Sequence, residues 1–130
     1  MKRLIQTRTH EEGTGDNCFA TAIACVMDLD SPEDVWQVQE HYPDGDEYRS
    51  ASWVLALSHW IEDRGYEWLI LPGHLMEDEY YLVSGECLRG THHVCVYKNG
   101  ELAHDPHPSG LGLTTEVNFE WIRKSEQILQ

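Results

Sequence analysis

The sequence contains few basic residues. Nine Lys and Arg stand against 23 Asp and Glu, so the formal net charge is −14 at pH 7. Proteins that bind a phosphate backbone depend on clustered Lys and Arg, and this shortage excludes nucleic acid as an expected partner. The acidic residues are spread along the chain, which indicates a solvated surface. Their long-range field attracts cations, so a basic peptide or protein is the favoured partner or substrate.

Long hydrophobic runs are missing as well. No segment approaches the roughly 18 apolar residues that span a bilayer, and the opening segment MKRLIQTRTH lacks the apolar core of a signal peptide. The four cysteines, at positions 18, 25, 87 and 95, include no CxxC pair and are too sparse for a disulfide scaffold. We therefore expect a soluble cytoplasmic protein with reduced thiols and no membrane partner.

No internal repeat or linker divides the chain, so we expect a single domain over residues 1–130. Its first half reads as a short strand, RLIQT, followed by helices. Residues 18–29 are apolar nearly all round, which is typical of a helix buried at the centre of a domain. Capping signals and helical spacing predict two more helices, over residues 31–40 and 53–65.

The second half has a different pattern. Short β-branched or aromatic runs, YEWLILP, EYYLVS, HHVCVY and ELAHD, are separated by Gly, Pro and Asn, which predicts strands. Helices first and strands later indicate an α+β fold with an antiparallel sheet. The last segment, from residue 114 onward, fits a strand, a helix or both.

Cys18 lies at the start of the apolar helix, where Asn17 or Asp16 supplies the N-cap. The free N–H groups and the dipole at a helix start favour negative charge, so they stabilise a thiolate relative to an ordinary thiol. The position suits a nucleophile, although small residues with no chemical role also occupy it. Cys25, two turns further on, reads as a core residue.

A second candidate group lies in HHVCVYKNGELAHDP, where KNG predicts a hairpin turn. With a two-residue turn, His92 shares a face with Asp105; with a three-residue loop, His93 lies directly opposite Asp105. We favour the three-residue loop because it places Leu102 on one apolar face with the two valines of the first strand. The carboxylate then orients the imidazole of His93 and stabilises its protonated form.

The order Cys, His, Asp and the segments GDNCFATAIACVM and HHVCVYKNGELAHDP resemble the papain-like cysteine peptidase superfamily, in particular small microbial branches related to bacteriocin-leader peptidases. The segment HDPHPSG also resembles that of small uncharacterised phage and bacterial proteins. The resemblance implies a papain-like fold in which the N-terminal buried helix bearing the cysteine packs on a C-terminal antiparallel sheet. It implies Cys18 as nucleophile, His93 as general base and Asp105 as orienting group, with no cofactor or metal.

The oxyanion donor of that superfamily is usually a glutamine a few residues before the cysteine, and Gln6 is the candidate here. Its separation from Cys18 is longer than usual, so either THEEGTG is a loop insertion or the donors are the Asn17 side chain and the Cys18 main chain. The implied activity is acyl transfer, by a peptidase, isopeptidase or amidase. Hydrolysis, transfer and deamidation would use the same residues.

Two other functions compete with this one. The histidines at 92, 93, 104 and 107 lie close to Asp105 in the sequence, and imidazoles with a carboxylate can bind zinc or iron. The alternation of strand side chains prevents all of them from converging, and this function would leave Cys18 unexplained. The other is a binding or inhibitory module on a papain-like scaffold, with its acidic surface as the contact face. Arg89, in the loop before the histidines, is a candidate contact for an acidic substrate group.

Overall fold

The computed structural model describes residues 1–8, 16–41 and 52–125. Helices come first and strands follow, so the protein is α+β, as expected. The elements in chain order are α1 (Cys18–Val26), the 3₁₀ turn η2 (Pro32–Asp34), α2 (Val38–His41), α3 (Ser52–Glu62), β1 (Tyr66–Leu71), β2 (Tyr81–Glu86), β3 (His92–Lys98), β4 (Glu101–His104) and β5 (Asn118–Lys124).

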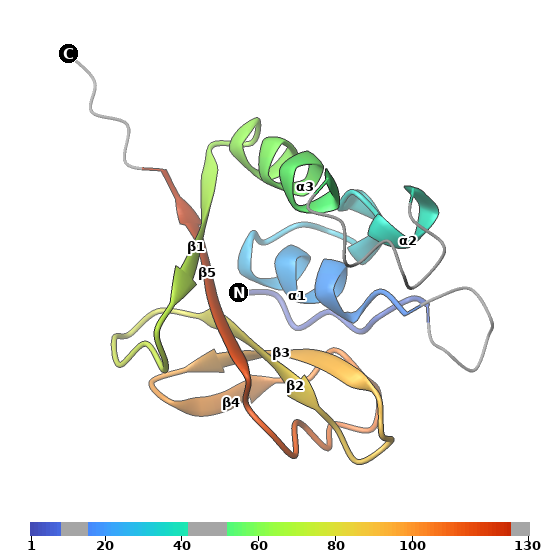
Figure 1. Ribbon diagram of the computed structural model, residues 1–130, viewed down its shortest axis with the longest axis vertical. Helices are drawn as coiled ribbons and strands as arrows, with labels where there is room; N and C mark the ends of the chain where they lie inside the picture. The colour runs from blue at the N-terminus through green and yellow to red at the C-terminus, as the bar shows by residue number, and fades with distance from the viewer. Residues whose placement is uncertain (9–15, 42–51, 126–130) are drawn as a thin grey trace.

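The strands form one five-stranded antiparallel sheet in the order β1-β5-β2-β3-β4. The segment whose structure the sequence left open is therefore β5, which pairs with both β1 and β2. Figure 1 shows α1 in the middle of the molecule, between the sheet and the other two helices. The strand that α1 contacts most is β3, whereas α3 packs against β1.

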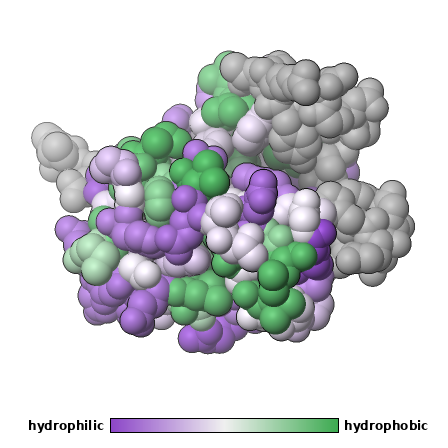
Figure 2. All heavy atoms as spheres, turned by 60° about the horizontal axis from the view of Figure 1, so that its bottom comes forward, coloured by the Kyte–Doolittle hydropathy of each residue, from purple (hydrophilic) through white to green (hydrophobic). Residues whose placement is uncertain are grey.

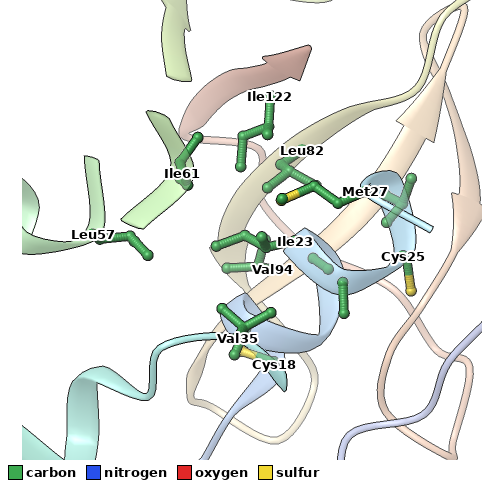
Figure 3. Packing of buried hydrophobic residues seen from close by; sticks show 14 residues of the cluster. Cys18, Ile23, Cys25, Met27, Val35, Leu57, Ile61, Leu82, Val94 and Ile122 are labelled. Carbon is green, nitrogen blue, oxygen red and sulfur yellow. The ribbon is translucent and has the colours of Figure 1, made fainter. Parts of the chain in front are cut away.

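Two apolar clusters lie on opposite faces of the sheet. The larger joins α1 and α3 to alternate residues of the strands, among them Leu82, Val94 and Val96. Figure 3 shows this cluster, with the sulfur atoms of Cys18 and Cys25 well separated on α1. The smaller consists of Tyr81, Val83, Cys95 and Tyr97. Because side chains alternate along β3, His93 lies on the face of the smaller cluster.

The expected strand RLIQT does not form. Residues 1–8 instead run between α1 and the segment that follows β4, held by single hydrogen bonds from Lys2 N to Cys25 O at 3.2 Å and from Gln6 N to Pro106 O at 2.8 Å. A strand needs a continuous ladder, which these isolated bonds do not supply. The second expected helix is also shorter: Pro32 begins one 3₁₀ turn, and a helical segment resumes only at Val38.

The β3–β4 hairpin has a two-residue turn, so the expected three-residue loop is wrong. Lys98 pairs with Glu101, and both Asn99 and Gly100 have positive φ, as a type I′ turn requires. A bulge then shifts the register, so that Val96 pairs with His104. The extra residue moves Asp105 to the His93 face of the sheet.

The surface mixes polar and apolar residues. On the face seen in Figure 2, apolar residues lie in separate groups among hydrophilic ones. Leu102, which the favoured hairpin register placed on an apolar face with the valines, is 43% exposed. Among the helices described, none has the length and apolar character needed to cross a membrane.

Candidate functional site

His93 and Asp105 form a buried pair. His93 Nε2 lies 2.6 Å from Asp105 Oδ1, and the two side chains are 0% and 1% exposed. The carboxylate accepts a hydrogen bond from Nε2–H. The other ring nitrogen, Nδ1, is therefore the one that can take up a proton. Nδ1 is buried and has no hydrogen-bond partner. This imidazole is therefore oriented at one nitrogen and unsatisfied at the other.

Three donors hold the Asp105 carboxylate. Besides His93, the main-chain N–H of His107 donates to Oδ1 and that of Gly112 donates to Oδ2, both at 2.8 Å. Burial on its own raises the pKa of Asp105. The hydrogen bonds, that from His93 first, outweigh burial and hold the pKa well below its usual range. Asp105 is thus a fixed carboxylate that also organises the loop after it.

That loop returns across the sheet beside the pair. Gly85 is the cross-strand partner of His93, and a Cβ added to it would lie 2.0 Å from the main-chain oxygen of Thr115. Thr114 N donates to Glu86 O at 2.7 Å, and Val117 N donates to Ser84 O at 2.8 Å. The chain therefore needs glycine at position 85, because the returning backbone occupies the space of a side chain.

Cys18 begins α1, as expected, and lies beside the strand that carries His93. The main chain of Val94, on that strand, lowers the pKa of Cys18, but other causes outweigh it. The thiol is buried, and its pKa is raised well above its usual value, first by burial and then by the Asp16 carboxylate. The expected stabilisation of a thiolate by the helix start is thus outweighed by lost solvation and a nearby negative charge.

Asp16 also occupies the main-chain donor at the helix start. Its Oδ1 accepts the N–H of Cys18 at 2.7 Å, whereas the N-cap residue itself is Asn17, whose side chain makes no capping bond. Both Cys18 and His93 belong to the described residues, and no hydrogen bond joins the sulfur to His93 Nδ1. The structure therefore brings His93 and Asp105 into contact, whereas Cys18, with a neutral thiol, packs in the cluster on the other face of their strand.

Gln6 is buried close to this group. Its main chain is bonded to Pro106, the residue after Asp105, and its Nε2 donates to Arg8 O at 2.9 Å. One of its two Nε2 hydrogens remains for another acceptor. Residues 9–15, which include most of the proposed THEEGTG insertion, lie outside the described part of the chain.

The alternative donor, the Asn17 side chain, is already engaged. Its Oδ1 accepts from the main chains of Thr7 and Arg8, at 3.1 and 2.9 Å, and its Nδ2 donates to Thr7, Glu33 and Gln37. These bonds tie the segment that carries Gln6 to the start of α1. Asn17 thus positions other residues, and its amide is committed elsewhere.

The histidines do not converge on one point. His92 is exposed, the ring of His104 bonds to Leu4 O at 2.5 Å, and the ring of His107 meets that of His93 edge to face. Within the described residues, the group that could hold a metal is His93, Cys95 and Asp105, whose donor atoms lie within 4.8 Å of one another. His93 Nε2 and Asp105 Oδ1 are hydrogen-bonded to each other there, so a metal held by these two atoms would have to break that bond.

Sequence reasoning did not foresee the contacts of three residues in this region. The alternation of strand side chains places Cys95 on the face of His93 and Asp105, but a metal-binding group of these three was not predicted. Asp16 was considered only as a helix cap, although its carboxylate also raises the pKa of Cys18. His107 packs on His93 through a loop that has no regular pattern in the sequence.

The comparisons with known proteins add no relationship. No family model, curated protein or solved structure matches this chain.

Proposed function

We propose that this protein is a thiol-dependent acyl-transfer hydrolase, a peptidase, isopeptidase or amidase, on a papain-like scaffold. Cys18 is the nucleophile, His93 the general base and later acid, Asp105 the group that orients His93, and Gln6 a donor to the oxyanion. The observation that carries the proposal is the imidazole of His93. It is fully buried, bonded to Asp105 through Nε2 and unpartnered at Nδ1.

In the proposed reaction the Cys18 sulfur bonds to the carbonyl carbon of an amide as its proton passes to His93 Nδ1. The carbon–nitrogen bond then breaks, and His93 gives that proton to the leaving amine. Water hydrolyses the thioester, with His93 as base, which releases the acid and restores the thiol. Because the pKa of the free thiol is raised, proton transfer to His93 has to accompany the attack. Cys18 packs on the other face of the sheet from His93, so the proposal also requires a movement that brings the two side chains together.

The oxyanion needs donors, and one of them is covered. The Cys18 N–H is bonded to Asp16, so the Asp16 carboxylate must leave when a substrate carbonyl enters. Its departure would also remove a negative charge from the thiol. In this proposal substrate binding therefore both exposes the donor and lowers the pKa of the nucleophile.

The proposal is tested by the rate at which iodoacetamide alkylates Cys18, read by peptide mass spectrometry, in a Cys87→Ser background. His93→Ala should slow the reaction about tenfold or more. His92→Ala is the matched control, because His92 is exposed and adjacent, and it should leave the rate unchanged. His93→Gln, which can still donate to Asp105, separates loss of the base from loss of folding.

Equal rates in all variants would overturn the proposal. In that case binding of zinc to the wild type, lost in Cys95→Ser, would favour the metal site of His93, Cys95 and Asp105. Retention of a basic protein partner by every variant would favour a binding module.

A further inference from the structure

Arg89 lies in the loop between β2 and β3, and its guanidinium is incompletely satisfied. Its Nη2 atom is buried without a hydrogen-bond partner, and Nη1 donates to Ser109 Oγ at 3.4 Å, which is a long bond. The loop is fixed by bonds between the main chains of Cys87 and Thr91 and of Gly90 and Cys87. The main chain of the loop is therefore fixed, and the guanidinium that it carries has no adequate acceptor among the described residues.

Arg89 differs in this respect from several other cations among the described residues. Carboxylates are abundant, and several described basic residues have one: Lys2 pairs with Asp30, Arg8 with Glu33 and Glu40, Lys98 with Asp78, and Arg123 with Glu67. Among the described residues no carboxylate lies within ion-pair distance of Arg89. A buried donor that lacks an acceptor requires an explanation, and a bound anion is one.

Arg89 is connected to the buried pair through two side chains. Ser109 Oγ, which accepts from Arg89, also lies 2.9 Å from His107 Nδ1. The ring of His107 meets that of His93 edge to face, with centroids 6.2 Å apart, and its main chain donates to Asp105. The free guanidinium nitrogen thus lies at the edge of the group assigned to catalysis.

We propose that Arg89 and Ser109 form a subsite for a carboxylate of the substrate, beside the amide that reacts. This inference rests on the proposed function and names its substrate class, an amide or peptide with a carboxylate close to the scissile bond. A planar guanidinium matches a carboxylate through two parallel bonds. An entering carboxylate would replace the long bond to Ser109 and give Nη2 its acceptor.

The subsite is compatible with an acidic surface. At physiological ionic strength, charges separated by more than about 8 Å are largely screened from one another. Direct contact with Arg89 therefore decides recognition at this point, whereas the net charge acts at longer range. The expected basic character of a substrate would belong to parts of it that lie outside this subsite.

Binding is tested with N-acetylglutamate, N-acetylglutamine amide and N-acetylglutamine, observed through the NMR resonance of the Arg89 Nε–H. The two compounds with a carboxylate should shift this resonance saturably, and the neutral amide should not. N-acetylglutamine carries only an α-carboxylate, and the α-amide of N-acetylglutamate carries only a side-chain carboxylate. Comparing the shifts that these two compounds cause shows which kind of carboxylate is preferred. Absence of a saturable shift with every carboxylate probe would overturn the subsite.

The link to catalysis is tested with bromoacetyl-glutamate amide and its neutral isostere, bromoacetyl-glutamine amide. We expect Cys18 to react about tenfold faster with the carboxylate reagent, and Arg89→Gln to bring the ratio close to one. Arg64→Gln removes a charge that packs over Trp60 and is the matched control; it should leave the ratio unchanged. A ratio insensitive to Arg89→Gln overturns the subsite, whereas rates insensitive to His93→Ala overturn the proposed function.

Discussion

The Asp105 carboxylate is the most heavily bonded group of the site, and replacing it with an amide gives a sharp test. It accepts from His93 and His107 at Oδ1 and from Gly112 at Oδ2. Asp105→Asn keeps the size of the side chain and exchanges one oxygen for an NH₂ group. Whichever way the amide turns, this NH₂ group faces an N–H that needs an acceptor.

The cost follows from that mismatch. The variant loses at least one hydrogen bond to a charged group, worth about 1.5–3 kcal/mol, and a buried donor remains unsatisfied. We therefore expect the free energy of unfolding at neutral pH to fall by about 3 kcal/mol. Asp78→Asn, which removes a carboxylate that is 87% exposed, should change it by less than about 0.5 kcal/mol.

Urea unfolding followed by circular dichroism measures both variants. Because the pKa of Asp105 is lower in the folded protein than in the unfolded chain, its contribution is complete above the unfolded value. It is lost as the pH falls through the folded value. The difference between wild type and Asp105→Asn should therefore persist down to about pH 4 and shrink only in stronger acid. A loss below about 1 kcal/mol at neutral pH would refute the reasoning.

Three further outcomes are expected. Gly85→Ala should lower the free energy of unfolding in urea by about 3 kcal/mol, because its Cβ would meet a main-chain oxygen at 2.0 Å. Gly73 has open space around it, so the control Gly73→Ala should stay close to wild type. Equal stability of the two variants would contradict the close approach at Gly85. In single-cysteine variants titrated by thiolate ultraviolet absorbance, Cys87 should ionise at a lower pH than the other three thiols. Its pKa is lowered, because hydrogen bonds outweigh burial, whereas the pKa values of the other three cysteines are raised. Asp16→Asn should lower the pKa of Cys18 in the same titration; an unchanged curve would mean that burial alone keeps the thiol neutral.

The sequence predicted local features well where one physical signal dominated. The uniform apolar run after Cys18 identified the central helix, and short β-branched runs identified β1 to β4. Helices before strands gave the α+β class. The pairs β2–β3 and β3–β4 are antiparallel because their connections are too short to cross between parallel strands.

Features that depend on long-range placement were harder to predict. The hairpin shows why: the choice of His93 as the partner of Asp105 rested on a three-residue loop, whereas the chain has a type I′ turn followed by a bulge. A bulge has no pattern in this sequence, yet it reverses which face Asp105 occupies. The pKa of Cys18 is a second case, since the helix-start argument could not include burial or the direction of the Asp16 carboxylate.

The position of β5 affects how the chain folds. Within the sheet, β5 lies between β1 and β2 and pairs with both. It is also the last of the described strands in the sequence. Until β5 has been synthesised, β1 and the β2–β4 meander are separate pieces without a common edge. The sheet is therefore completed by contacts between segments far apart in sequence, which slows folding. The buried surroundings of His93 then form late, after synthesis of the chain that carries them.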